Sequence, residues 1–287
     1  MPTQTKPTDY HSEIKPTWCP GCGNWTISFS LMQALADLKL EPHQVALTFD
    51  IGCSGNGADK IKTYSFKSLH GRALLPAIGI KYANHQLPVI AMIGDGGMYW
   101  EGAAHWTAAA QRNEDITVLV ADNQIYGLTT GQTSPTTEVG CPTKTQPEGT
   151  LDEPINPIAT SIAAGATFVA RAWVGDPTHL QTMIKAAINH KGFAIVDILQ
   201  TCVTFNHVNT LEYYRDRVYK LEEVGHDFSN KLKAYQYAEE TKKTPLGIFY
   251  QTSKPTINDK HQALKSTQPL YTQKTKTNIK PLLKLFK

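Results

Sequence analysis

Uninterrupted apolar runs alternate with segments of helical spacing through the middle of the chain. Five runs are short enough for strands and apolar enough to be buried on both faces of a sheet; they lie at residues 45–53, 88–93, 116–121, 166–174 and 193–199. Between and beside them, apolar residues recur at helical spacing at residues 24–38, 68–84, 98–110, 156–165 and 177–190. Strands that alternate with helices predict an α/β fold of the doubly wound type, with a largely parallel sheet.

The two ends of the chain differ from this alternating core. Residues 1–17 are polar and dotted with proline, and we expect them to form an N-terminal extension to a core domain at residues 18–205. Residues 206–255 are expected to pack on the core or on a partner, and charged residues at helical spacing predict a helix at 209–223. Residues 256–287 are basic and are predicted to form a flexible or partner-docking tail.

Polar residues follow two neighbouring strands of the predicted sheet. Asp95 comes after the run at 88–93 inside Gly-Asp-Gly, and Asn123 comes after the run at 116–121. Because the carboxyl ends of parallel strands meet at one edge of a sheet, oxygen ligands at both positions can converge on one point. Such ligands suit Mg2+, and the glycines with the following helix N-terminus suit a phosphate. Taken alone, however, Gly-Asp-Gly is also an ordinary surface turn.

The spacing of these residues narrows the choice. Gly-Asp-Gly followed after 26 residues by Asn resembles the thiamine diphosphate fingerprint. In that motif the Asp, the Asn and a main-chain carbonyl two residues further on hold Mg2+ against the diphosphate. The resemblance implies Mg2+ ligands at Asp95, Asn123 and Ile125, with Gly94 and Gly96 beside the cofactor.

Two neighbouring features can serve the same site. His70 and Arg72 begin the helical segment at 68–84, where such residues either cap and pack the helix or contact the anionic end of a cofactor. Residues 126–150 form a long stretch rich in Gly, Thr and Pro. Long loops in compact domains are usually functional or disordered. Because this one follows Asn123, we expect it to lie over the bound ligand.

The five cysteines are an odd number and are widely scattered, which argues against a disulfide framework. Cys19 and Cys22 lie in a tight turn before a helix, whereas Cys53 and Cys202 lie at the ends of strands. A lone Cys-x-x-Cys is compatible with a thiol–disulfide couple, half of a zinc site or half of an iron–sulfur site. Cys141 lies in the long loop, outside this pattern, and is expected to be a simple thiol.

Composition is that of a globular protein rather than a membrane or disordered one. Of the 287 residues, 41% are hydrophobic and 18% charged, and no apolar run is long enough to span a bilayer. The N-terminus lacks the apolar core of a secretory signal, so the expected location is cytoplasmic. Eight lysines and one aspartate give residues 251–287 a positive charge. This basic tail lacks interleaved aromatic residues, which argues against nucleic-acid binding as a function.

Several blocks, taken in order, resemble the β subunit of 2-oxoacid:ferredoxin oxidoreductases. They are WCPGCG, DIGCSG, LHGRALLPAIGIKYAN, GDGG, the NQIYGLTTGQTSPTT block and QTCVTFN. Each block is moderately specific, but their order and spacing make the likeness strong. The likeness extends from about residue 14 to about residue 255.

The resemblance implies a cofactor set and a reaction. A 4Fe–4S cluster would be held by the thiolates of Cys19, Cys22, Cys53 and Cys202, a choice over zinc that the spacing of the thiols alone does not make. Thiamine diphosphate would be bound with Mg2+. The further residues implied at the cofactor pocket are Gly52, Cys53, Ser54, His70 and Arg72. The reaction of the family converts a 2-oxoacid (pyruvate or 2-oxoglutarate), CoA and oxidised ferredoxin to acyl-CoA, CO2 and reduced ferredoxin.

The resemblance also implies a partner. The glutamate that activates the aminopyrimidine ring of the cofactor belongs, in this family, to another subunit. The sequence offers no second α/β domain that could carry it, so the catalytic glutamate is expected on an α (or fused γ–α) subunit.

Three positions depart from the pattern of the family. Asn56 and Thr130 stand where many relatives carry a basic residue suited to a substrate carboxylate, which leaves the preferred 2-oxoacid open. Gly97 stands where an acidic residue is frequent, and we expect this change to leave Mg2+ binding intact.

Two alternatives remain at this point. The first is a non-redox thiamine diphosphate-dependent decarboxylase or synthase component whose cysteines hold structural zinc. The second is a non-catalytic scaffold or nucleic-acid-binding protein that uses its basic tail.

Overall fold

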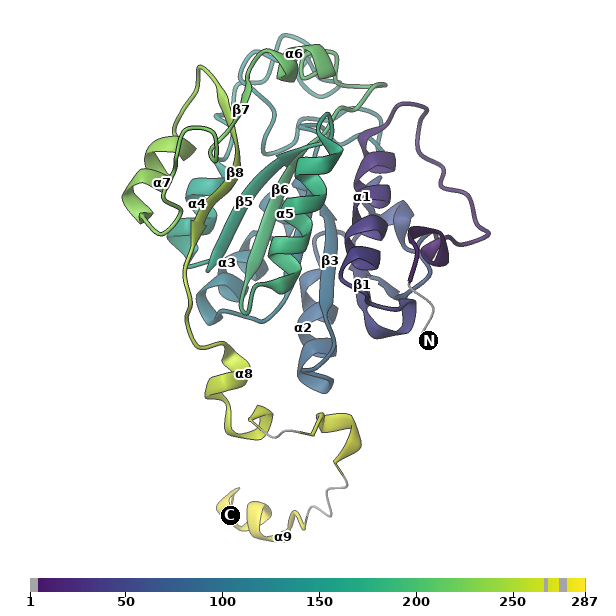
Figure 1. Ribbon diagram of the computed structural model, residues 1–287, viewed down its shortest axis with the longest axis vertical. Coiled ribbons are helices and arrows are strands. Elements are labelled where there is room, and N and C mark those ends of the chain that lie inside the picture. The colour runs from purple at the N-terminus through teal and green to yellow at the C-terminus, as the bar shows by residue number, and fades with distance from the viewer. Residues whose placement is uncertain (1–4, 266–267, 274–277, 287) are drawn as a thin grey trace.

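A single twisted sheet lies at the centre of the computed structural model, which describes residues 5–265, 268–273 and 278–286 (Figure 1). Within this part of the chain, eight strands follow the order β2-β1-β3-β4-β6-β5-β8-β7. Neighbouring strands are parallel, except that β5 and β8 are antiparallel. The strands are β1 (Ala46–Phe49), β2 (Tyr64–Lys67), β3 (Val89–Gly94), β4 (Thr117–Asp122), β5 (Phe168–Trp173), β6 (Ala194–Leu199), β7 (Val218–Lys220) and β8 (Thr244–Gln251). The predicted α/β fold with a largely parallel sheet is confirmed.

Helices cover both faces of the sheet (Figure 1). On one face lie α1 (Gly23–Asp37) and α5 (Pro177–Asn189). On the other lie α2 (Leu74–Ala83), α3 (Ala103–Arg112), α4 (Pro157–Ala164) and α7 (Lys231–Ala238). Successive side chains of a strand point to opposite faces. Leu47 and Phe49 therefore belong to the core under α1, whereas Ala46 belongs to the core under α2. Burial on both faces explains why these strands are continuously apolar.

Three local predictions need correction. The sequence predicted no strand at β2, because all four of its residues are exposed and no apolar pattern marks them; backbone pairing with β1 alone defines it. The helix predicted at 209–223 ends early as α6 (Leu211–Arg215), because the following residues pair with β8 as β7. The helix predicted at 98–110 begins with a π-helical turn, Gly97–Glu101, and continues as α3.

The two ends of the described chain are tied to the core. Tyr10 is fully buried, and its hydroxyl donates to the carbonyl oxygen of Leu40. Beyond β8 the chain forms short helices, including α8 (Ile257–Lys260) and α9 (Lys280–Leu283). Asp259 of α8 lies 2.7 Å from the Lys191 ammonium. Residues 1–4 of the predicted extension, and 266–267, 274–277 and 287 of the predicted tail, lie outside the described residues.

Across the described ranges, none of the helices combines the length and the apolar character that crossing a membrane requires.

Asn113 joins four parts of the fold and is the most instructive single residue for its stability. It ends α3 with a left-handed φ of 55° and is buried. Its Oδ1 accepts from the Phe193 N–H and the Thr167 hydroxyl, both at 2.8 Å, and its Nδ2 donates to the Lys254 carbonyl at 3.0 Å. One side chain thus connects α3, β5, β6 and the C-terminal segment.

We expect Asn113→Ala to destabilise the protein by about 2–4 kcal/mol, because it leaves buried polar groups unpaired and places a Cβ-bearing residue without side-chain hydrogen bonds in the left-handed region. Urea unfolding followed by circular dichroism measures this loss. Asn113→Gly is the matched control, because glycine tolerates the backbone conformation and isolates the contribution of the side chain. A midpoint equal to that of the unmodified protein in both variants would contradict this role.

Candidate functional site

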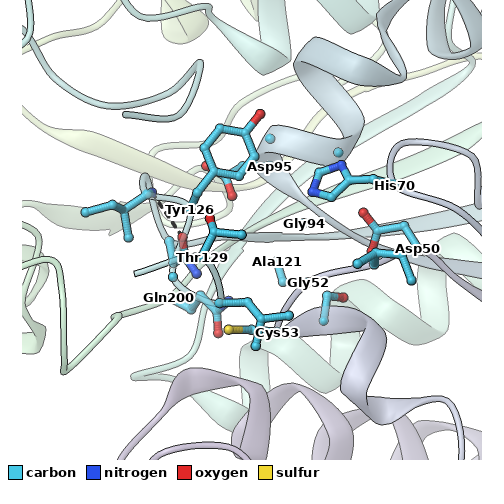
Figure 2. A pocket seen from close by; sticks show the side chains of 18 residues that line it. Asp50, Gly52, Cys53, His70, Gly94, Asp95, Ala121, Tyr126, Thr129 and Gln200 are labelled. Carbon is cyan, nitrogen blue, oxygen red and sulfur yellow. Dashed lines mark hydrogen bonds between the residues drawn. The ribbon is translucent and has the colours of Figure 1, made fainter. Parts of the chain in front are cut away.

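Four neighbouring strands end in polar residues that meet at one edge of the sheet. Asp50 follows β1, Asp95 follows β3, Asn123 follows β4 and Gln200 follows β6. All four line one cleft. In the view of Figure 2, Asp95 lies on one side of this cleft and Asp50 on the other. The carboxyl ends of the parallel strands therefore converge as the sequence predicts.

Most of the residues that the sequence assigned to a cofactor lie in this cleft. Those among its lining residues are Gly52, Cys53, Ser54, His70, Gly94, Asp95, Gly96, Asn123 and Ile125. Arg72 is not among them. Its guanidinium donates instead to the carbonyl oxygens of Gly71 and Glu101, at the start of the segment that leads into α3.

Asp95 is buried, and a hydroxyl from the long loop contacts it. Thr136 Oγ1 lies 2.8 Å from Asp95 Oδ2 and 2.9 Å from Asp122 Oδ1. A hydroxyl has one proton, so it can donate to only one of these two carboxylates at a time. Burial raises the pKa of Asp95 to about 6, and burial with the nearby Asp197 and Asp95 raises the pKa of Asp122. Both carboxyls are therefore harder to ionise than that of an exposed aspartate.

The turn after β4 orients Asn123 and Ile125. Asn123 Oδ1 accepts from the Ile125 N–H at 3.0 Å across Gln124, whose φ of 57° reverses the chain. Asn206 donates to the Asn123 carbonyl at 3.0 Å and fixes the backbone of this turn. Two potential oxygen ligands, two residues apart, are thereby held at the floor of the cleft.

Several buried polar atoms of the cleft have no hydrogen-bond partner among the described residues. They are both carboxyl oxygens of Asp50, Ser54 Oγ and Gln200 Oε1. Buried polar groups are normally paired, so a group of orphaned atoms in one cleft indicates a polar ligand.

Asp50 is one of the residues of this site that the sequence analysis missed, together with Gln200, Tyr126 and Thr136. Its carboxyl is fully buried and occupies the space in front of Gly97, where an added Cβ would fall 2.1 Å from Asp50 Oδ2. A carboxyl therefore lies near position 97 even though the residue there is glycine. The available signal was an aspartate inside the apolar run at 45–53, at the point where the structure ends β1.

The start of the long loop, at Tyr126, closes one side of the cleft. Tyr126 packs over Gly96, where an added Cβ would lie 2.2 Å from its ring, so only glycine fits there. The Tyr126 hydroxyl donates to Glu101 at 2.8 Å, and the other oxygen of Glu101 lies 3.4 Å from His70 Nδ1. Glu101 thus holds two lining side chains together from outside the cleft.

Four cysteines meet in a second cavity beside the first. Cys19, Cys22, Cys53 and Cys202 all line it. Two indole N–H groups order the backbone around these thiols: that of Trp18 donates to the Cys53 carbonyl at 2.6 Å and that of Trp25 to the Cys19 carbonyl at 3.2 Å. All five cysteines are free thiols, and Cys141 is not among the residues that line the cavity.

The thiols share this cavity without converging on a single point. Within the part of the chain that the structure describes, no three His, Cys, Asp or Glu side chains are grouped closely enough to chelate one metal ion. Burial raises the pKa of Cys22, and burial with the three neighbouring thiols raises that of Cys53 to about 12. Burial therefore favours the protonated form of Cys22 and Cys53, and a metal centre would have to displace the protons of these two thiols.

The backbone of Gly127, which has no side chain, lies between the two cavities. Cys53, Asn123, Gly127 and Leu128 line both of them. A Cβ added to Gly127 would lie 3.3 Å from the Cys202 sulfur and 3.5 Å from the Cys53 sulfur.

Comparisons with known proteins assign this architecture to a class. A family model described as "Thiamine pyrophosphate enzyme, C-terminal TPP binding domain" matches residues 50–198. A second model, for the C-terminal part of the β subunit of pyruvate ferredoxin oxidoreductase, matches residues 202–266. Thiamine pyrophosphate is thiamine diphosphate under its older name. The fold and its cleft are therefore those of a thiamine diphosphate-binding domain.

Individual relatives define the family. The chain is 44% identical over 252 residues to "2-oxoacid:ferredoxin oxidoreductase 1, subunit beta" of Aeropyrum pernix, covering 84% of this chain and 79% of that one. It is 43% identical over 270 residues to the corresponding β subunit of Saccharolobus solfataricus, covering 88% and 87%. The solved 2-oxoglutarate:ferredoxin oxidoreductase of Magnetococcus marinus superposes with a TM-score of 0.91 at 36% identity, over 99% of this chain and 97% of that one.

The chain belongs to the 2-oxoacid:ferredoxin oxidoreductase family, as a β subunit. It is thus part of a multi-subunit oxidoreductase that acts with ferredoxin, and its designation as β implies an α partner.

The orphaned carboxyl of Asp50 makes stability depend on pH. Burial is the main cause that raises the pKa of Asp50 well above its ordinary value of 3.8. A carboxyl whose pKa is higher in the folded state favours folding less as the pH rises above the unfolded value. We therefore expect Asp50→Asn to stabilise the cofactor-free protein, by about 1–3 kcal/mol at pH 8 and less at pH 5.

Thermal unfolding at the two pH values measures this difference. Asp216→Asn is the matched control, because Asp216 is exposed. A gain from Asp50→Asn that is the same at both pH values would contradict a buried, protonated Asp50.

Proposed function

We propose that this β subunit binds thiamine diphosphate with Mg2+ in the cleft and a 4Fe–4S cluster in the thiol cavity. The enzyme would oxidatively decarboxylate a 2-oxoacid with CoA to acyl-CoA and CO2 and pass the electrons through the cluster to ferredoxin. The observation that carries the proposal is the common wall, because four residues line both cavities. A redox centre and a decarboxylation cofactor must lie close together if electrons are to pass from one to the other.

The residues of the cleft fit a magnesium-bound diphosphate. Asp95 and Asn123 offer side-chain oxygens and Ile125 a carbonyl, which are the hard donors that Mg2+ prefers. A cation on Asp95 would also leave the Thr136 hydroxyl free to donate to Asp122, which resolves the competition between two carboxylates for one proton. Gly94 leaves room for the phosphates, because an added Cβ there would meet no atom within 4 Å, and the Ser54 hydroxyl is available to the cofactor.

The donor set of the thiol cavity supports a cluster better than zinc. A single zinc ion needs all four sulfurs at about 2.3 Å from one point. The four thiols instead surround a shared space, with no closely grouped set of three chelating side chains among the described residues. A polynuclear iron–sulfur centre fills such a space, because each sulfur then binds a different metal ion. The non-redox alternative with structural zinc is therefore the weaker one.

When bound, thiamine diphosphate supplies the stabilisation of the carbanion that a 2-oxoacid leaves on loss of CO2. The residues of this chain position the cofactor and exclude water: Tyr126 covers Gly96, and Glu101 fixes Tyr126 and His70. No glutamate is found among the described residues that line the cleft. This supports the expectation that the α partner provides the activating glutamate and completes the active site.

The substrate class follows from the relatives. The solved neighbour from Magnetococcus marinus is described with 2-oxoglutarate, coenzyme A and succinyl-CoA bound. We infer that the substrate of this enzyme is a small 2-oxoacid of the same kind, 2-oxoglutarate or pyruvate, and that CoA accepts the acyl group.

Asp95→Ala tests the cofactor site. We expect the αβ complex with this substitution to lose at least about 100-fold in thiamine diphosphate affinity, because a charged Mg2+ ligand is removed. Binding to the unsubstituted complex should weaken as the pH falls through about 6, since the pKa of Asp95 is raised to about 6 and its protonated form cannot hold Mg2+. Isothermal titration calorimetry with Mg2+ measures both effects. Asp216→Ala, at an exposed carboxyl, is the control; tight cofactor binding by Asp95→Ala would refute the site.

Cys202→Ser tests the cluster. Anaerobically purified αβ complex should contain iron and labile sulfide in equal amounts, and Cys202→Ser should lose most of both together with the brown colour, because one thiolate ligand is missing. Cys141→Ser is the matched control, because Cys141 lies outside the thiol cavity. Elemental analysis and visible absorption measure the result. A colourless complex that contains zinc and no iron would establish the alternative function instead.

A further inference from the structure

The segment that follows β6 reaches both the cleft and the thiol cavity. Gln200 lines the cleft, whereas Cys202 lines the thiol cavity. Further along the same segment, the Thr204 hydroxyl donates to the sulfur of Cys19 at 3.2 Å. Residues 200–206 are therefore a short connection between the space proposed for the cofactor and the space proposed for the cluster.

Two hydrogen bonds attach this segment to the end of β4. The Gln200 N–H donates to the Asp122 carbonyl at 2.8 Å, which continues the pairing of β6 with β4 beyond the last paired residues. At the other end of the segment, Asn206 Nδ2 donates to the Asn123 carbonyl at 3.0 Å. Cys202 lies between these two attachment points. Its place relative to Asn123 is therefore fixed from both sides, once by the backbone and once by a side chain.

Asn206 also contacts the main chain of Cys202. The Asn206 backbone N–H donates to the Cys202 carbonyl at 3.0 Å. One residue thus contacts a proposed magnesium ligand through its side chain and a proposed cluster ligand through its backbone. Asn206 itself is not among the residues that line the cleft or the thiol cavity. Any effect that it has on either centre must therefore pass through Asn123 or Cys202.

The amide of Asn206 is buried and fully hydrogen-bonded. Besides the Asn123 carbonyl, Nδ2 donates to Asn209 Oδ1 at 3.0 Å, while Oδ1 accepts from the N–H groups of Val208 and Asn209, both at 3.0 Å. A primary amide has two donors and an oxygen with two lone pairs, so all of its capacity is used. The two acceptor contacts hold the turn at 206–209, and the two donor contacts fix the direction in which Nδ2 points.

The long loop anchors this turn from outside. Asn209 Nδ2 donates to Glu138 Oε1 at 2.9 Å, and the Tyr213 hydroxyl of α6 donates to the same oxygen at 2.6 Å. Buried polar networks in which each member has a partner make their surroundings rigid. Asn206 is therefore held in one position on the side away from Asn123 and Cys202.

We propose that Asn206 is a positioning residue that sets the place of the magnesium-binding turn relative to the Cys202 thiolate. This inference rests on the proposed function and adds to it the residue that keeps the two centres at a fixed separation. The turn that carries Asn123 and the turn that carries Cys202 come from different strands, and Asn206 contacts the backbone of both. A change at this one side chain would therefore be felt at both centres.

Two substitutions in the anaerobically purified αβ complex separate the two contacts. Asn206→Ala removes every side-chain hydrogen bond of the residue, whereas Asn206→Asp removes the donors to Asn123 and Asn209 but keeps an acceptor for the N–H groups that hold the turn. We expect both variants to lose at least about 10-fold in thiamine diphosphate affinity, the size of one lost hydrogen bond, as measured by isothermal titration calorimetry with Mg2+.

The cluster side is measured by electron paramagnetic resonance of the dithionite-reduced complex. Asn206→Ala should shift the g values of the signal, because the loosened turn no longer holds the Asn206 N–H against the Cys202 carbonyl, while the iron and sulfide content stays unchanged. Asn206→Asp should leave the spectrum as it is. Asn113→Ala is the matched control: Asn113 is likewise 3% exposed and hydrogen-bonded, but lines neither space, so affinity and spectrum should not change.

Other outcomes would overturn the assignment. Unchanged cofactor affinity in the Asn206 variants, a loss of the same size in Asn113→Ala, or an unchanged cluster spectrum in Asn206→Ala would each mean that Asn206 does not position the two centres. Failure of the proposed function is seen separately: the unsubstituted complex would then bind no thiamine diphosphate or contain no iron, whereas failure of the Asn206 inference alone leaves both in place.

Discussion

The burial of polar groups at the ends of four parallel strands is the constraint on which the rest of the structure depends. Asp50, Asp95, Asn123 and Gln200 are all buried at one edge of the sheet. Burying such groups without partners costs free energy, and the surroundings satisfy only some of them. The long loop brings Thr136 to this edge, and glycines make the space. Burial of these groups therefore has a cost in free energy that a charged cofactor and its cation would offset.

The sequence predicted the central strands and the cofactor residues for one reason. Strands buried on both faces leave continuous apolar runs, and the polar residue that ends each run marks the edge where parallel strands meet. Asp95 and Asn123 were found in this way, and both line the cleft. The order of strands across the sheet could not be read from these runs, because pairing is decided by packing of the whole chain. The convergence of Cys53 and Cys202 came from the family likeness.

What escaped prediction depends on contacts between distant residues. The exposed strand β2 exists through backbone pairing, and β7 exists because β8 lies beside it, so neither leaves an apolar pattern. Thr136 is one of many threonines in a loop without periodicity, and only the folded chain places it between two carboxylates. Lys144 is likewise one lysine in that loop, and its contact with Thr130 follows from a path that no local rule specifies.

The position of Gly127 between the cleft and the thiol cavity limits how substrate preference can change in enzymes of this kind. The cleft and the thiol cavity share Gly127 as a lining residue. A side chain introduced at position 127 would therefore change both spaces at once. A substitution at Gly127 would affect both spaces together, whereas a substitution at the rim of either space would affect only that one. We therefore expect substrate preference to change through substitutions elsewhere in the long loop, while glycine is retained at position 127.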